Sequence, residues 1–146
     1  MAHPRAPLER LIRANADEIN RLQRLIHETA ALRWRGPEEK QRHAEACAQF
    51  HQRYAELAFP GGYAHALQQL AAHDPNIVDG VLTFLEVRPY FFRSGYMWKT
   101  LYKRVQRVPM GVNQQARLQA IVAAYTAYRA ARDARGSDPF ATGKGL

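Results

Sequence analysis

The stretch LERLIRANADEINRLQRLIHETAAL, residues 8–32, decides the fold class. Its apolar residues recur at three- and four-residue spacing, which is the period of one face of an α-helix. Polar residues such as Arg13 and Asp17 occupy the other face. The stretch therefore predicts one long amphipathic helix, and its apolar stripe is wide enough to pack on this protein's core or on a partner helix. The stripe consists of Leu8, Leu11, Ile12, Ile19, Leu22, Leu25, Ile26 and Leu32.

Outward from this helix, glycines and prolines divide the chain into further helices. Gly36 and Pro37 end the first helix and begin a second that runs to about Leu57. The run Phe59-Pro60-Gly61-Gly62 predicts a turn. Four shorter helices follow in the prediction. Their expected boundaries are side-chain caps at Asp74, Ser94 and Asn113, an end before Pro89 and an end at about Arg107.

The whole pattern predicts an all-α fold, a compact bundle of about six helices with some of them paired as stacked helical hairpins. No segment alternates with period two, so no β-sheet is expected. A chain of 146 residues suits one domain, which we expect over residues 1–135. The segment 136–146 bears Gly, Ser and Pro and predicts a flexible tail.

Charge is distributed unevenly along the chain. The formal net charge is +8, from 21 basic and 13 acidic residues. Residues 87–132 hold nine of the basic residues and none of the acidic ones, so the rest of the chain is nearly neutral. This asymmetry predicts an acidic partner for the C-terminal half, whether a nucleic acid, an anionic surface or an acidic protein.

The predicted helix after Ser94 carries the densest part of this charge. Lys99, Lys103 and Arg107 follow one another at four-residue spacing, where like charges repel. An external anion would relieve the repulsion, which favours a binding face over the alternative of a merely solvated face. Upstream, Arg88 and Arg93 lie beside a predicted helix N-terminus, which also attracts anions. For the arginines, the alternative is that Arg93 pairs with Glu86, whereas the aromatic residues 90–92 are expected to belong to the core.

These patterns favour a non-enzymatic protein-binding module, such as an adaptor, an assembly subunit or an inhibitor of the immunity-protein type, that docks on an acidic protein. Trp98 and Tyr102 are expected to be exposed beside the basic residues, and aromatic and arginine side chains dominate interface energetics. The predicted partner-binding residues are Arg88, Arg93, Lys99, Lys103, Arg104, Arg107, Trp98 and Tyr102.

Nucleic-acid binding through the same face is the alternative, because its aromatic residues could stack on bases while its cations neutralise phosphates. No helix-turn-helix, zinc-finger or RNA-recognition signature supports it. Attachment to an anionic membrane is less favoured, since the apolar side of the basic helix is needed for the core. No segment reaches the roughly 20 apolar residues of a membrane span.

Catalytic and metal-binding chemistry is weakly represented. His43, Cys47 and His51 lie at four-residue spacing on the second predicted helix, but the outer members are too far apart to share one metal ion. We therefore expect a buried structural Cys47 flanked by surface histidines. No nucleophile with an adjacent base and no glycine-rich phosphate loop is evident, so no catalytic residue and no cofactor is expected. A single cysteine fits a reducing compartment, and we expect the protein in the cytoplasm.

Overall fold

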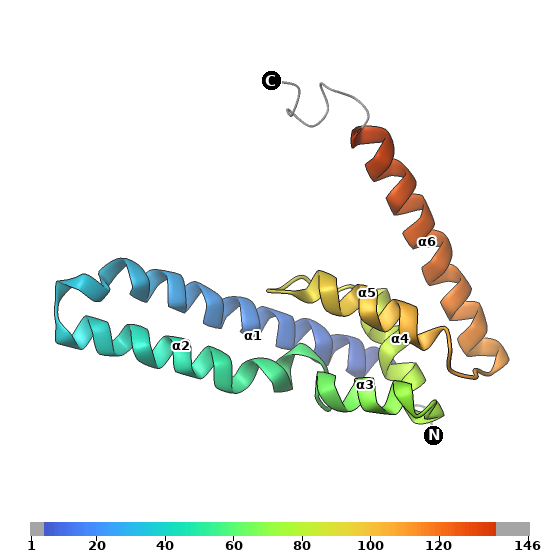
Figure 1. The fold of residues 1–146 in the computed structure, drawn as a ribbon, viewed down its shortest axis with the longest axis horizontal. Helices are drawn as coiled ribbons and strands as arrows, with labels where there is room; N and C mark the ends of the chain where they lie inside the picture. Colours follow the sequence, from blue (N-terminus) through green and yellow to red (C-terminus); the bar gives the residue numbers. More distant parts are fainter. Residues whose placement is uncertain (1–4, 137–146) are drawn as a thin grey trace. The chain divides into compact units, whose positions relative to one another are not determined.

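The structure is a computed structural model that describes residues 5–136 (Figure 1). Within this range the chain forms six α-helices and two short 3₁₀ helices and no β-strand, which confirms the predicted all-α fold. The chain divides into two compact units, Met1–Pro109 and Met110–Leu146. The single domain predicted over residues 1–135 therefore stays a prediction.

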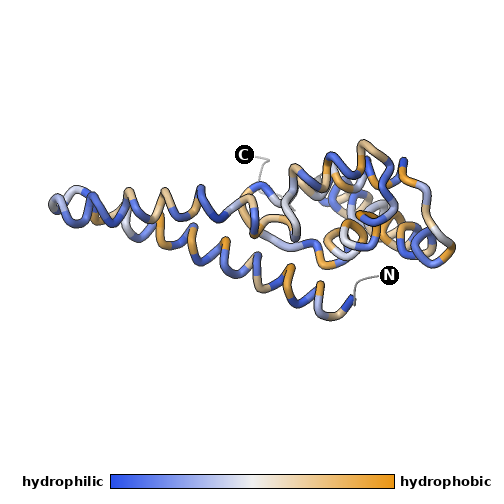
Figure 2. Tube along the Cα trace, turned by 90° about the horizontal axis from the view of Figure 1, so that it is seen from below, coloured by the Kyte–Doolittle hydropathy of each residue, from blue (hydrophilic) through white to orange (hydrophobic). Residues whose placement is uncertain are grey.

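The first unit is built on a helical hairpin. Helix α1, Arg5–Leu32, and helix α2, Pro37–Ala58, run antiparallel and side by side (Figure 1). The 3₁₀ helix η1, Arg33–Arg35, joins them. The residues that α1 buries lie three or four positions apart, as the sequence predicted, but they occupy only the first two thirds of the helix: Ile12, Ala16, Ile19 and Leu22. The far end of the hairpin is mostly hydrophilic (Figure 2) and exposes its few large apolar side chains.

Three further helices pack at the other end of the hairpin. They are α3, Tyr63–Ala71, α4, Val78–Val87, and α5, Ser94–Val105, and α4 contacts both α1 and α5. Helix α4 is the most deeply buried, because six of its ten residues are inaccessible to solvent. Phe84 of α4 packs against Phe59 with ring centroids 5.4 Å apart. The core of the first unit therefore lies around α4, which packs between α1 and α5.

Local sequence signals set most of the helix boundaries. Gly61 and Gly62 adopt φ angles of 86° and 96°, so the predicted turn after α2 requires glycine. The side chain of Asp74 accepts a hydrogen bond from the backbone N–H of Asn76, which confirms the predicted cap, although the element it opens is the 3₁₀ helix η2, Pro75–Ile77, ahead of α4. Helix α4 ends at Val87, ahead of Pro89, as predicted.

Two predicted helix caps are wrong, and one helix ends slightly before its predicted end. Ser94 is the first residue of α5 and not its cap, since Arg93 holds the N-cap position. The same helix ends at Val105, and Arg107 follows in a turn in which its N–H bonds to the carbonyl of Arg104. Helix α6 begins at Val112, so Asn113 lies inside its first turn and is not its cap, and the Gln114 side chain accepts a hydrogen bond from the Gly111 N–H ahead of the helix.

The second unit consists of helix α6, Val112–Gly136. Its Tyr125 and Tyr128 rings stack with centroids 6.5 Å apart. The guanidinium of Arg129 lies 5.8 Å from the Tyr125 ring centroid. The tail predicted over 136–146 lies outside the described residues, apart from Gly136, which ends α6.

Candidate protein-interaction surface

The predicted partner-binding residues lie on one loop and on the helix that follows it. Arg88 and Arg93 are the two ends of the loop between α4 and α5, residues 88–93, which we call the arginine-bracketed loop. Lys99, Lys103 and Arg104 are exposed on α5, and Arg107 is exposed in the turn after it. The structure therefore brings these residues onto one continuous segment of the first unit.

Both arginines that bracket the loop adopt the left-handed backbone conformation. Arg88 has φ 50° and ψ 62° and ends α4, where its N–H bonds to the Phe84 carbonyl at 2.9 Å. Arg93 has φ 67° and ψ 11° and begins α5. A residue with a Cβ atom is disfavoured there by about 1 kcal/mol or more. The loop is thus held in a strained shape by its surroundings and is not simply a relaxed connection.

Three polar side chains fix the loop backbone. Asn20 of α1 donates its amide N–H to the Tyr90 carbonyl at 2.9 Å. The hydroxyl of Tyr54 on α2 donates to the Phe92 carbonyl. At the start of α5, the Ser94 hydroxyl oxygen accepts a hydrogen bond from the Phe91 N–H at 3.0 Å. Because the anchors come from both helices of the hairpin, the hairpin determines the loop conformation.

Tyr54 is suited to its role as a donor. Its ring packs against those of Phe91 and Phe92, with centroids 6.1 Å and 6.3 Å away. Burial of the hydroxyl raises the pKa of Tyr54, while the nearby Arg93 charge lowers it by less. The tyrosine therefore keeps the proton that it donates to the loop.

The loop presents aromatic side chains to solvent. Phe91 is buried, but Tyr90 is 88% exposed and Phe92 is 44% exposed. Tyr96, in the first turn of α5, is 78% exposed. The expectation that the aromatic residues 90–92 all belong to the core is therefore right for Phe91 and wrong for Tyr90 and Phe92. Large aromatic rings on a fixed backbone lose little conformational freedom on binding, which is the property of interface anchors.

The arginines lie against aromatic rings. The guanidinium of Arg93 lies 5.2 Å from the Phe92 ring centroid. That of Arg88 lies 4.8 Å from the Trp98 ring centroid. The predicted pair between Arg93 and Glu86 is wrong, because the carboxylate of Glu86 pairs with Arg5 at 2.9 Å. Both arginines are exposed at the two ends of the loop.

Trp98 and Tyr102 do not lie where the sequence placed them. Trp98 is only 5% exposed, and its indole N–H donates to the Leu85 carbonyl of α4 at 3.0 Å. Tyr102 is half-buried and stacks on Trp98, with ring centroids 5.0 Å apart. The expectation of an exposed Trp98 is therefore wrong, because the α5 face that carries it packs on α4. Trp98 supports the surface from beneath and positions Arg88.

The exposed cations on and after α5 have no acidic partner among the residues that the structure describes. Within residues 5–136, none of Lys99, Lys103, Arg104 and Arg107 forms an ion pair. The hairpin differs, since Glu18 of α1 pairs with Arg21 and with Arg53 of α2. The charge of the hairpin is thus partly satisfied internally, whereas that of the α5 segment faces solvent. The acid-free sequence continues into α6, but that helix belongs to the other unit.

The histidine and cysteine residues of α2 take part in local contacts. Nδ1 of His43 lies 3.0 Å from the Thr29 hydroxyl, and its Nε2 lies 3.6 Å from Sγ of Cys47. Cys47 is half-buried, so the expectation of a buried structural thiol is wrong in that respect. His51 is exposed on the following turn. Over the described residues, no three His, Cys, Asp or Glu side chains are grouped closely enough to hold a metal ion.

The comparisons with known proteins place no further constraint on function. No protein-family model matches the chain, no curated protein matches its sequence, and no solved structure matches its fold. Among residues 5–136, no helix has the length and apolarity that crossing a bilayer requires.

Proposed function

We propose that this protein is a non-enzymatic binding module that docks on an acidic protein through the arginine-bracketed loop and the cations of α5. The observation that carries the proposal is the pair of strained arginines holding exposed aromatic rings between them. Protein interfaces are typically rich in tyrosine, phenylalanine and arginine at their centre and have a charged rim. An adaptor, an assembly subunit and an inhibitor of a cognate protein all fit this description.

The strain at Arg88 and Arg93 supports a binding role. Glycine would adopt both conformations freely, and a solvated loop gains nothing from arginine there. The guanidinium of Arg93 lies beside the exposed Phe92 ring, so one partner surface could contact apolar and cationic groups together. Because the backbone is already fixed by Asn20 and Tyr54, docking would order few additional groups.

An acidic protein is favoured over a nucleic acid because Trp98, unlike the exposed Tyr90, Phe92 and Tyr96, offers no face to a base. A stacking platform needs an aromatic face open to a base. The largest aromatic side chain of the α5 segment is instead buried and covered. The proposal places the module in the cytoplasm, in keeping with the single Cys47.

The test is an affinity capture from the native host, performed with and without nuclease, with the double variant Tyr90→Ala/Tyr96→Ala as the comparison. Both side chains are more than three-quarters exposed, so the variant should fold. We expect the wild-type protein to retain a stoichiometric acidic protein after nuclease treatment and the double variant to lose it. Each truncated aromatic anchor should weaken binding by roughly 1–2 kcal/mol.

The matched control is Trp34→Ala. Trp34 is 77% exposed, and it too lies beside arginines, but at the far end of the hairpin. It should keep the partner. Capture of the same protein by the double variant, or loss of every protein partner on nuclease digestion, would refute the proposal, and the second result would identify a nucleic-acid-binding protein.

A further inference from the structure

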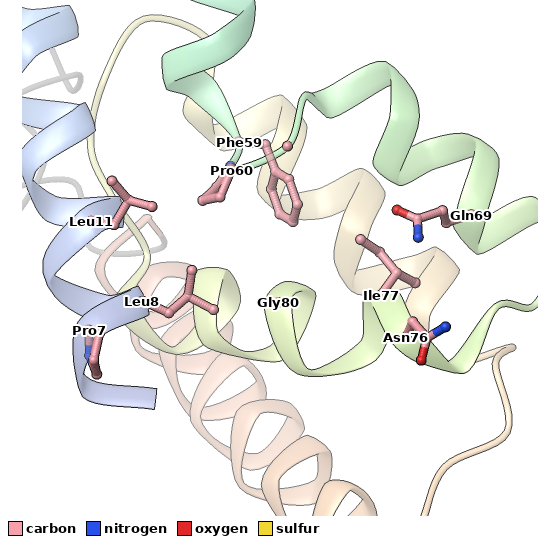
Figure 3. A pocket seen from close by; sticks show the side chains of 10 residues that line it. Pro7, Leu8, Leu11, Phe59, Pro60, Gln69, Asn76, Ile77 and Gly80 are labelled. Carbon is pink, nitrogen blue, oxygen red and sulfur yellow. The ribbon is translucent and has the colours of Figure 1, made fainter. Parts of the chain in front are cut away.

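A cavity of about 540 Å³ lies in the first unit (Figure 3), and none of the proposed docking residues lines it. It opens between the first turns of α1, the turn that follows α2, and the η2–α4 segment. This volume lies within the range of pockets that hold small molecules. Its walls are formed by Pro7, Leu8, Leu11, Phe59, Pro60, Gly61, Gln69, Asn76, Ile77 and Gly80.

The lining of this cavity contains no charged side chain, although the protein carries a net charge of +8. Leu8 and Leu11 of α1 form one wall, and Leu11 remains 47% exposed at the side of the cavity. Phe59 and Ile77, both buried, form the opposite wall. A charged ligand would lose hydration here without meeting a counter-ion, whereas an uncharged apolar ligand would lose little.

Gly80 makes room for an occupant. Glycine is among the residues that favour a helix least, and Gly80 lies in the first turn of α4. Close packing does not require it, because a Cβ atom built there would meet only the Phe59 ring, at 3.9 Å. Because residue 80 is glycine, the space that a larger side chain would fill at this position is part of the cavity.

Gln69 gives the cavity a fixed polar group. Its side-chain Nε2 donates to Oδ2 of Asp74 at 3.1 Å, which orients the amide. The pKa of Asp74 is lowered by the Asn76 N–H and then by Gln69, so the carboxylate remains an acceptor. This is the one hydrogen bond of the Gln69 side chain among the described residues, and its Oε1 and second N–H remain for a ligand.

We infer that this cavity binds a neutral, mostly apolar small molecule with one hydroxyl or carbonyl group that hydrogen-bonds to the Gln69 amide. Hydrophobic walls supply the affinity of such a site, and a single oriented polar group supplies its orientation. The site is independent of the proposed docking surface, since the two share no residue.

The experiment uses phenylbutanol, phenylbutanoate and phenylbutylamine, which share one apolar body and differ in charge. Binding is followed by shifts of backbone amide signals and by the melting temperature. We expect phenylbutanol to shift the signals of residues 7–11, 59–61 and 76–80 and to raise the melting temperature. The two charged probes should bind at least about tenfold more weakly.

Two pairs of variants localise the binding. Gly80→Leu fills the cavity and should abolish the response to phenylbutanol, while Gly95→Leu, whose side chain enters open space on α5, should retain it. Gln69→Leu should weaken phenylbutanol binding without loss of fold, and the exposed neighbour Gln68→Leu should not. The inference is overturned if phenylbutanol gives no localised shifts, if Gly80→Leu binds it as well as Gly95→Leu, or if phenylbutanoate binds equally well.

Discussion

At the scale of single residues, we expect Arg93 to lower the stability of the protein and to contribute to partner binding. Its left-handed backbone conformation is one that glycine adopts without penalty. Glycine also serves as a helix N-cap, the position that Arg93 occupies at the start of α5. We therefore expect Arg93→Gly to raise the free energy of unfolding by about 0.5–1 kcal/mol in urea titrations, and at the same time to weaken partner binding.

His73 is the matched control for this prediction. It adopts φ 56° just after α3, so the strain is of the same kind, but it lies outside the arginine-bracketed loop. His73→Gly should give a similar gain in stability and leave binding unchanged. A loss of stability in Arg93→Gly would show that its backbone is not strained, and full binding by that variant would remove Arg93 from the interface.

At the scale of elements, the hairpin is joined by an ion-pair network centred on Glu18. The carboxylate accepts hydrogen bonds from Arg21, one turn along α1, and from Arg53 of α2 at 2.6 Å. Arg21 first and then Arg53 lower the pKa of Glu18 from 4.5 to about 2. A pKa lowered by folding means that the folded state is stabilised above the ordinary pKa, and that the effect is lost as pH falls from 4.5 toward 2.

We expect Glu18→Gln to lower the free energy of unfolding at pH 7 by about 0.5–1 kcal/mol, since the network is partly exposed. The difference from wild type should shrink as the pH falls through this window and vanish near its lower end. Urea unfolding across the pH range measures it. Glu38→Gln removes a carboxylate that is 84% exposed and 3.7 Å from Arg42, and should change little at any pH. A constant effect of Glu18→Gln at all pH values would contradict an electrostatic origin.

Also at the scale of elements, the sequence predicts where helices end but not which aromatic side chains are exposed. Helix boundaries follow from neighbouring residues, so the Gly36-Pro37 break and the stop before Pro89 were predictable. The exposure of an aromatic side chain depends on distant partners. The indole N–H of the buried Trp98 donates a hydrogen bond to the Leu85 carbonyl, 13 positions away. The carbonyl of the exposed Tyr90 accepts a hydrogen bond from Asn20, 70 positions away. No local pattern contains those contacts.

At the scale of the whole molecule, the uneven distribution of charge affects how a charged partner associates with the protein. The cations of the α5 segment are exposed and form no ion pair among residues 5–136, so an acidic partner would be attracted before contact. We expect the triple variant Lys99→Glu/Lys103→Glu/Arg107→Glu to remain folded by circular dichroism. It should bind the captured partner at least about tenfold more weakly, mainly through slower association.

The control for the triple variant changes the net charge by the same amount at the far end of the hairpin, through Arg33→Glu/Arg35→Glu/Lys40→Glu. Those three cations are also exposed, so an equal loss of binding would show that total charge, not its position, governs the interaction.

The salt dependence of binding separates the two classes of partner, an acidic protein and a nucleic acid. A protein interface anchored by Tyr90, Phe92 and Tyr96 should weaken modestly as salt rises, because its apolar contacts are not screened. A nucleic acid would instead show a steep linear fall of log affinity with log salt, and the triple variant would reduce that slope.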